Sequence, residues 1–310
     1  MKHNFHNTLV VCGGTAGHIF PAICFAYKYN CTVMLENNGI KYYEKFTQLR
    51  NIEINTILFQ CKKNNILSII TTVLNNYKNV YYYDKIILFG SFYCIPFLIL
   101  GVICNKKIII HEQNAILGSF NFFASFFAYQ ILSTFQYIDL NNKKVLHFGL
   151  PMLHKINYGI SKQKYILILT GSQCSEDLDN IIDNIIEISH NFNYIVYINT
   201  LNHDKYKNIE NIVAQPFFDN WERVIQQAHL VISHSGSSTI SYLILYNKNA
   251  ILIPLTHSHR NHQIYNAIYS GFPYFIQNNM DKKILYDMII NFFSHKISLR
   301  SYNSYFKISE

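Results

Sequence analysis

Short apolar runs alternate with longer stretches of helical spacing along this chain of 310 residues. In the first half, runs rich in Val, Ile, Leu and Tyr predict strands at 8–12, 31–35, 52–57, 86–89, 107–111 and 130–133. In the second half, the same pattern predicts strands at 165–170, 194–199, 211–213, 230–233, 250–254 and 273–276. Such alternation is typical of an α/β protein with doubly wound parallel sheets, whose helices cover both faces.

One stretch, 86–104, carries no charge over 19 residues and approaches the length that spans a bilayer. Gly90 and Ser91 interrupt it after a short apolar run, and Pro96 follows soon afterwards. A second strand-like run begins just beyond it. We therefore predict a strand, a turn, a buried helix and a second strand here rather than a membrane-spanning helix.

A glycine-bearing turn closes the first strand of each half, CGGTAGH at 12–18 and LTGSQCS at 169–175. Between them, GLPM at 149–152 precedes a linker-like segment. The sequence thus predicts two Rossmann-like domains facing each other across a cleft. Their expected bounds are 1–152 and 153–290, with a C-terminal tail at 291–310 that could cross back to the first domain.

The formal net charge is +8, but no block of Lys and Arg exceeds two residues. The chain also has no zinc-finger or RNP-type motif, so nucleic acid is not expected as a partner. Seven scattered cysteines without a C-x-x-C pair indicate free thiols in a reducing compartment. The first residues lack an apolar segment of the length that a secretory signal needs.

Gly13, Gly14 and Gly17 stand between a predicted strand and a predicted helix, where free backbone N–H groups favour anions. The spacing is not that of the dinucleotide fingerprint, and no P-loop motif is present. A purely structural turn is the alternative. His18 follows at the first helical turn, where the helix dipole favours the neutral imidazole and suits it as a general base. A histidine that only bonds a nearby carbonyl is equally compatible with this position.

Three further motifs follow predicted strands. The turn at 235–239 offers small residues and hydroxyls that could hold a diphosphate without a metal, and no D-x-D motif is present. The run HEQN at 111–114 could handle a sugar or a proton, or could form a polar surface loop. His257, His259 and His262 have a spacing that zinc could use, but the neighbouring amides favour hydrogen bonding to a sugar.

Taken in order, GGTAGHIFPA (13–22), GSF (90–92), HEQNAILGSFN (111–121), GLP (149–151), TGSQ (170–173), SHSGSSTIS (233–241) and HSHRNHQIYNA (257–267) resemble the MurG family. These enzymes are the N-acetylglucosaminyltransferases of peptidoglycan synthesis. The resemblance implies a GT-B fold, and we expect neither a cofactor nor a metal. It also implies inverting transfer of N-acetylglucosamine from UDP-N-acetylglucosamine to the 4-hydroxyl of lipid I, giving lipid II. The second domain would bind the donor and the first the acceptor.

The resemblance assigns roles position by position, with His18 as the expected catalytic base. The expected donor-binding residues are Thr15, Ala16, Gly17, Asn114, Ser172, Phe218, Gly236, Ser237, Ser238, Thr239 and Gln263. The expected acceptor-side residues are Gly14, Phe92, His111, Glu112 and Asn121.

Several positions depart from the family pattern. Tyr242 stands where the family has the glutamate that binds the ribose, and His234 and Leu153 stand where it has arginines. Leu150 replaces an asparagine, Thr170 and Cys174 replace glycines, and Phe92 replaces a tyrosine. Two alternatives therefore stay open: a non-catalytic GT-B relic that binds lipid or partner proteins, and a glycosyltransferase with another nucleotide-sugar donor.

The stretch 61–78 places Lys62, Lys63 and Lys78 around an apolar helical pattern. This arrangement predicts an interfacial helix for an anionic membrane surface, although an ordinary packed helix is the alternative. By the resemblance, the protein would be peripheral at the cytoplasmic face of the plasma membrane and could contact cell-wall synthesis proteins.

Overall fold

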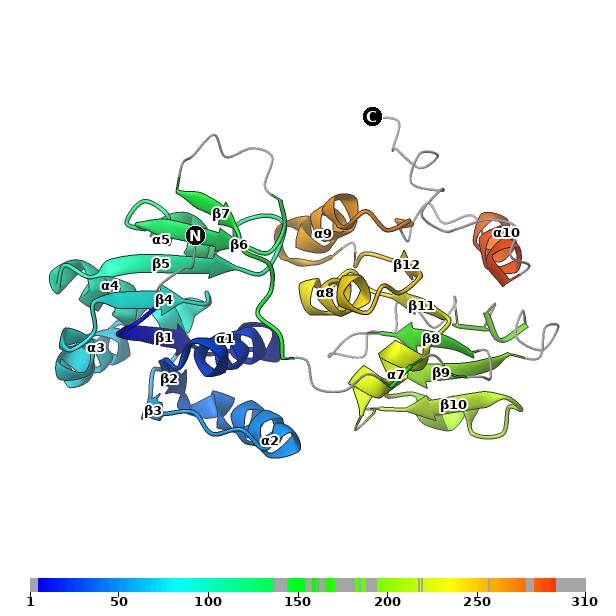
Figure 1. The fold of residues 1–310 in the computed structure, drawn as a ribbon, viewed down its shortest axis with the longest axis horizontal. Helices are drawn as coiled ribbons and strands as arrows, with labels where there is room; N and C mark the ends of the chain where they lie inside the picture. Colours follow the sequence, from blue (N-terminus) through cyan, green and yellow to red (C-terminus); the bar gives the residue numbers. More distant parts are fainter. Residues whose placement is uncertain are drawn as a thin grey trace. The chain divides into compact units, whose positions relative to one another are not determined.

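The structure is a computed structural model. It describes residues 5–136, 144–153, 158–159, 161, 165–170, 182–183, 185–187, 194–216, 218, 220–255, 257–276 and 282–293. The chain divides into two compact units, Met1–His154 and Lys155–Glu310, and each is described by itself (Figure 1). The predicted division at 152 lies two residues before this boundary. Of the predicted tail at 291–310, residues 291–293 form the end of α10 (Lys282–Phe293), and the rest lies outside the described residues.

The first unit is built on a seven-stranded sheet in the order β3-β2-β1-β4-β5-β6-β7, with every pair parallel. Its strands are β1 (Thr8–Cys12), β2 (Thr32–Glu36), β3 (Thr56–Phe59), β4 (Lys85–Leu88), β5 (Lys107–Glu112), β6 (Gln130–Ser133) and β7 (Val145–His147). The strand order reverses between β1 and β4: β2 and β3 are added on one side of β1, and β4 to β7 on the other. Doubly wound folds bind their ligands at such a position.

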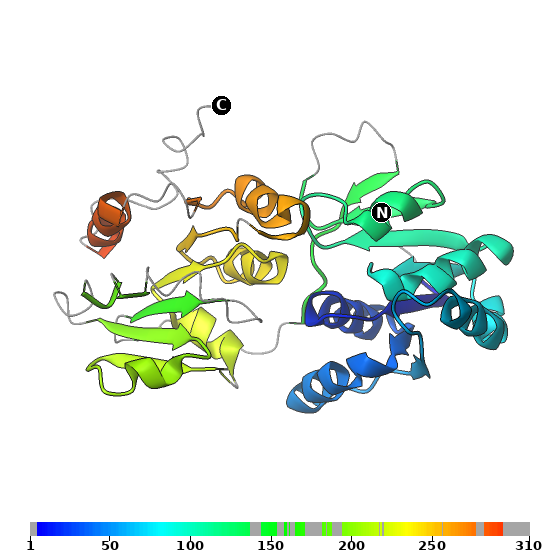
Figure 2. The ribbon, with the colours of Figure 1, turned by 180° about the vertical axis from the view of Figure 1, so that it is seen from behind.

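Different helices cover the two faces of this sheet (Figures 1 and 2). The helices are α1 (Ala16–Tyr29), α2 (Ile40–Arg50), α3 (Ile66–Tyr81), α4 (Ile95–Ile103) and α5 (Ser119–Ala124), with short 3₁₀ turns η1 (Asn37–Gly39) and η2 (Phe92–Cys94). Alternate strand residues point to opposite faces, so Val10 packs with α1 and α2 whereas Leu9 packs with α3 and α4. The unit therefore has an apolar core on each side of the sheet.

The second unit carries a five-stranded parallel sheet in the order β10-β9-β8-β11-β12. Its strands are β8 (Tyr165–Leu169), β9 (Ile195–Asn199), β10 (Ile212–Gln215), β11 (Leu230–Ser233) and β12 (Ala250–Leu252). Its helices are α7 (Trp221–Gln227), α8 (Ser237–Leu245), α9 (His262–Ser270) and α10 (Lys282–Phe293), with η4 (His203–Tyr206) and η5 (His259–Asn261). One buried cluster forms its core, and no described cluster contains residues of both units.

The predicted fold class, two Rossmann-like α/β domains, is confirmed by these two sheets. The charge-free stretch forms β4, η2, α4 and then β5, as predicted. No helix in the described part of the chain is both long and apolar enough to cross a membrane.

Three strand predictions need correction. The predicted strand at 52–57 is displaced, because β3 begins only at Thr56. Ile52 lies before the strand, and its side chain packs in the buried cluster between the sheet and the helices α1 and α2. The strand β7 was not predicted, since three residues beside a lysine make too weak a pattern. At 273–276 only Tyr274 forms an isolated bridge, to Leu252.

Candidate active site

The glycine loop follows β1 at the carboxyl edge of the first sheet and leads into α1. Gly13 is tightly packed: a Cβ there would lie 2.8 Å from the Cβ of Glu36 and 3.0 Å from that of Tyr93. Gly14 has φ +88°, a left-handed conformation that glycine adopts without strain. Thr15 is the N-cap of α1 and makes no side-chain capping bond. The first amides of α1 are thus presented at an open helix N-terminus.

His18, the predicted base, is half-buried in the first turn of α1. Its Nδ1 lies 2.8 Å from the carbonyl oxygen of Phe89 and 3.1 Å from Oε1 of Gln113. Both oxygens only accept, so Nδ1 carries the hydrogen and donates to them. In the neutral form of the ring the lone pair is then on Nε2, which has no hydrogen-bond partner among the described residues. In that form the ring presents a nitrogen without a partner, which can accept a proton.

Gln113 links His18 to the buried His111. The Gln113 amide donates from Nε2 to the Phe89 carbonyl at 3.0 Å and to the His111 carbonyl at 3.2 Å, which leaves Oε1 to accept from His18. His111 lies fully buried, stacked on Phe89 with ring centroids 4.8 Å apart, and donates from Nε2 to the Gly149 carbonyl at 3.1 Å. Burial lowers the pKa of His111 to about 4, so this ring stays neutral.

Glu112 holds the loop that follows β5. Its carboxylate is 2% exposed and accepts from the backbone N–H of Asn114 and of Gly118, each at 2.9 Å. It also accepts from Nδ2 of Asn121 at 2.8 Å and from Nδ2 of Asn114 at 3.3 Å. Four donors on one buried carboxylate fix the loop and the start of α5 relative to the sheet. The side chain of Glu112 thus positions its neighbours.

Asn121 lies beside His18. A Cβ added to Gly90 would meet the His18 ring at 3.3 Å and Nδ2 of Asn121 at 3.4 Å, so both side chains pack over the same glycine. Gly90 has φ +90° and leaves room that any other residue would fill. Oδ1 of Asn121 is buried without a hydrogen-bond partner in the described structure. Such an unfilled acceptor is the kind of atom that a bound ligand or water satisfies.

The first unit therefore brings together several of the predicted residues, from three adjacent strands. Gly14 and His18 follow β1, Gly90 and Phe92 follow β4, and the 111–121 segment runs from the last two residues of β5 into α5. Because all these strands are parallel, their carboxyl ends meet at one edge of the sheet. The result is a histidine with an available ring nitrogen beside an open helix N-terminus, an arrangement that can remove a proton from a hydroxyl held near an anion.

In the second unit, the 233–239 turn connects β11 to α8. Ser235 donates from its hydroxyl to the Gln263 carbonyl at 2.7 Å, and Nδ2 of the buried Asn266 donates to the Ser235 carbonyl at 3.0 Å. Oε1 of Gln263 accepts from the backbone N–H of Leu255 at 3.1 Å. Its Nε2 has no partner among the described residues. The turn and α9 thus present one amide donor beside the N-terminus of α8, whose N-cap is Gly236.

Tyr242, which the resemblance matches to the ribose glutamate of the family, is buried on α8. Its hydroxyl donates to Oε1 of Glu222 on α7 at 3.2 Å, and its ring packs against Trp221 with centroids 4.2 Å apart. A carboxylate therefore lies next to this position although residue 242 is not acidic. His234, which the resemblance matches to an arginine, is 4% exposed, and its Nδ1 lies 2.7 Å from the Ile253 carbonyl oxygen.

The remaining predicted positions are placed as follows. Phe218 is buried near Tyr197, with ring centroids 6.0 Å apart. Leu153 packs against the core beneath α1, which explains why an apolar residue suits this position. Ser172 and Cys174 lie outside the described residues, as does the side chain of His259.

Two remaining features are the possible metal ligands and the cysteines. Within the described residues, no three or more His, Cys, Asp or Glu side chains gather as a metal site would require. The six described cysteines are free thiols, five of them buried. Burial raises the pKa of Cys94 to about 12, which leaves this thiol protonated and unreactive.

Sequence reasoning named Gln113 only within the HEQN motif and Gly90 only within the GSF motif, without a role of its own for either, and it did not single out Glu222. Gln113 stands two residues after His111, on the same side of the extended chain, and that alternation is the signal that could have identified it. Ser91 was also missed; it has φ +76° and donates to the Gly13 carbonyl at 3.1 Å, joining the two loops. Glu222 has no signal in the sequence, because its proximity to Tyr242 arises only from the packing of α7 on α8.

Two family models match the chain: the glycosyltransferase family 28 N-terminal domain over residues 8–133, and the C-terminal domain of the same family over 165–270. The curated relatives include the UDP-N-acetylglucosamine--N-acetylmuramyl-(pentapeptide) pyrophosphoryl-undecaprenol N-acetylglucosamine transferase of Sulfurihydrogenibium sp. (strain YO3AOP1). It is 28% identical over 284 residues, which cover 82% of this chain and 79% of the relative. The enzyme of the same name from Wolbachia pipientis subsp. Culex pipiens (strain wPip) is 29% identical, and the alignment covers 94% of this chain and 91% of that relative.

Solved structures agree on the fold. MurG of Acinetobacter baumannii superposes with a TM-score of 0.71 at 18% identity, covering 94% of this chain and 92% of that structure. The glycotransferase of kitacinnamycin superposes with a TM-score of 0.70 at 9% identity, covering 96% of this chain and 92% of that structure. Both units of the chain are matched by the two family models, and the chain belongs to glycosyltransferase family 28.

Proposed function

We propose that this chain transfers N-acetylglucosamine from UDP-N-acetylglucosamine to the 4-hydroxyl of lipid I, which forms lipid II in peptidoglycan synthesis. The relatives named for this reaction align over most of their own length and most of this chain. The observation that carries the proposal is the state of His18. Its Nδ1–H is held by two carbonyl oxygens, and Nε2 is left as the acceptor of a proton.

In this reaction the acceptor's hydroxyl attacks the anomeric carbon of the donor sugar while UDP leaves. Nε2 of His18 removes the hydroxyl proton as the new bond forms, and the resulting imidazolium keeps its Nδ1 hydrogen bonds to Phe89 and Gln113. The open N-terminus of α1 supplies amides for the acceptor's diphosphate. The configuration at the anomeric carbon inverts because attack and departure occur on opposite faces.

The donor is assigned to the second unit. The N-terminus of α8, with Ser237, Ser238 and Thr239 in its first turn, offers amides and hydroxyls to the diphosphate of UDP. The free amide of Gln263 lies near this turn and can donate to a sugar hydroxyl. Glu222 is our candidate for the carboxylate that binds the ribose, because Tyr242 holds it beside the family's glutamate position.

A membrane surface is the expected place of action, since the acceptor is a lipid. The side of the first unit formed by α3, α4, α5 and the turn after α5 exposes large apolar side chains: Ile66 is 74%, Leu74 70% and Phe126 69% exposed. Exposed lysines such as Lys62 and Lys78 stand beside them. Apolar groups that enter the lipid interface next to lysines that attract anionic headgroups would dock the protein peripherally at the cytoplasmic face.

Release of UDP from UDP-N-acetylglucosamine in the presence of a lipid I analogue tests the proposal. We expect release that depends on the analogue, and a loss of at least a hundredfold in turnover with little change in donor affinity for His18→Ala, because general bases contribute about 10²–10⁴-fold. The control is His6→Ala, an exposed histidine before β1. Wild-type protein that releases no UDP with any acceptor would instead support the non-catalytic alternative.

A further inference from the structure

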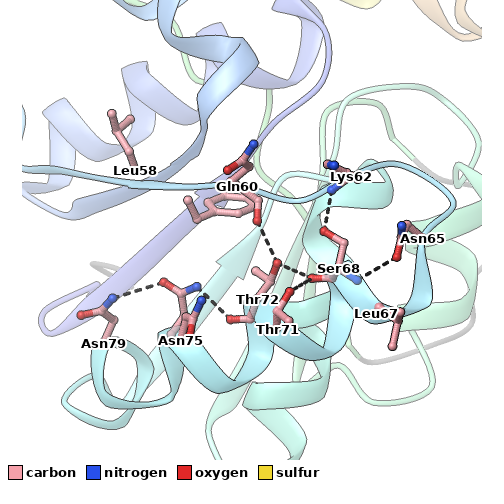
Figure 3. Close-up of a pocket in the computed structure, with 12 residues that line it drawn as sticks. Leu58, Gln60, Lys62, Asn65, Leu67, Ser68, Thr71, Thr72, Asn75 and Asn79 are labelled. Atoms are coloured by element: carbon pink, nitrogen blue, oxygen red, sulfur yellow. Dashed lines mark hydrogen bonds between the residues drawn. The ribbon is translucent and has the colours of Figure 1, made fainter.

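The first unit contains a groove that the proposed chemistry does not use. It lies between the end of β3 and helix α3, with a volume of about 690 Å³, within the range of small-ligand sites (Figure 3). Twelve residues line it: Leu58, Phe59, Gln60, Lys62, Asn65, Leu67, Ser68, Thr71, Thr72, Asn75, Asn76 and Asn79. Most of them carry amides or hydroxyls, and none is acidic.

Some of these polar groups are already paired with one another. Thr72 donates to the Gln60 carbonyl at 2.9 Å, Asn76 donates to the Thr72 carbonyl at 2.8 Å, and Asn79 donates to Oδ1 of Asn76 at 3.2 Å. These bonds brace the wall of the groove. The side-chain amides of Gln60 and Asn75, by contrast, are exposed and have no partner among the described residues. Each can both donate and accept a hydrogen bond.

The backbone of β3 adds a second set of free groups. In the described sheet β3 is an edge strand, paired only with β2. The N–H of Val33 donates to the Asn55 carbonyl at 2.8 Å, so Asn55 faces β2. Alternation along the strand then turns the backbone N–H and C=O of Leu58 away from β2, on the side where no described strand pairs. An edge with donors and acceptors beside free amides suits an extended peptide.

We propose that this groove binds the short peptide carried by the acceptor. The inference rests on the proposed function, in which the acceptor is an N-acetylmuramyl-pentapeptide. Five extended residues span roughly 17 Å. Along α3, the eleven-residue step from Ser68 to Asn79 covers about 16 Å, so the peptide and the groove match in length.

The groove also lies within reach of the base. The strands β3 and β1 are two positions apart in the sheet, which corresponds to roughly 10 Å, and both end at the same edge. A muramyl sugar held near His18 can therefore start its peptide at the Gln60 and Asn65 end of the groove. The peptide then runs toward Asn79, antiparallel to β3. Its backbone amides pair with Leu58, Gln60 and Asn75.

Direct binding tests this inference without turnover. Two fluorescent probes are used in anisotropy titrations: N-acetylmuramyl-pentapeptide without diphosphate or lipid, and N-acetylmuramic acid without peptide. For wild type we expect the pentapeptide probe to bind more tightly. Gln60→Ala and Asn75→Ala should each weaken it about three- to tenfold, the effect of one lost hydrogen bond, and leave the sugar probe unchanged. Asn75→Trp, which fills the groove, should weaken the pentapeptide probe further.

The matched control is Gln48→Ala, an exposed amide on α2 outside the groove. Circular dichroism melting confirms that each variant is folded. Equal affinity of both probes for wild type, or an unchanged pentapeptide affinity in Asn75→Trp, overturns the inference. Loss of vesicle binding in Asn75→Trp with unchanged peptide affinity would assign the groove to a lipid headgroup and also overturn it. Peptide binding without UDP release would instead refute the proposed function alone.

Discussion

The buried His111 should make the stability of the first unit sensitive to acid. Its pKa falls from 6.5 to about 4 because burial penalises the charged ring, which stacks on Phe89 and donates to Gly149. A lowered folded-state pKa contributes stability that is fully present above pH 6.5 and is lost as the pH falls toward 4, because only the unfolded chain takes up the proton there. At pH 5 the loss is about 2 kcal/mol.

Amide hydrogen exchange of β5, followed by mass spectrometry, measures this loss where it occurs. Fluorescence would not, since Trp221 is the single tryptophan and lies in the second unit. Between pH 8 and pH 5, protection of Ile108–Ile110 should fall roughly thirtyfold more in wild type than in His111→Gln, after correction for intrinsic exchange. Glutamine keeps a polar tip but does not titrate. Equal losses of protection in the two proteins would refute the reasoning.

Three further substitutions give separate outcomes. Glu112→Gln should lower the free energy of unfolding by about 2–3 kcal/mol in urea titrations, because at least one buried donor loses its acceptor; the exposed Glu44→Gln should change it little. Glu222→Gln should weaken UDP-N-acetylglucosamine binding roughly tenfold in calorimetry if its carboxylate binds the ribose, and unchanged affinity would exclude that role. Phe126→Asp should reduce co-sedimentation with anionic vesicles, whereas equal pelleting would exclude the turn after α5 from the docking surface.

Much of the fold could be predicted because its strands are continuous apolar runs. The predictions of β1, β6 and β11 match the structure residue for residue, since both faces of a parallel sheet are buried and the runs stand out from their flanks. At β3, an edge strand with only partial burial, the pattern extends over the preceding coil and the prediction begins four residues early. Weak burial therefore made the start of this strand ambiguous.

The candidate site was predictable in its types of residue and not in its hydrogen bonds. His18 and the 111–121 segment could be identified as chemically suited and as matches to the family. The contact of His18 with Gln113 joins residues 95 positions apart, and that with Phe89 joins residues 71 apart. No local pattern encodes such contacts, because they depend on the order of strands in the sheet. The protonated nitrogen of His18 could therefore be assigned only from the structure.

Among the described residues, none of the three buried clusters contains side chains from both sides of the boundary between His154 and Lys155. A core substitution in one unit should therefore leave the described core of the other unit intact.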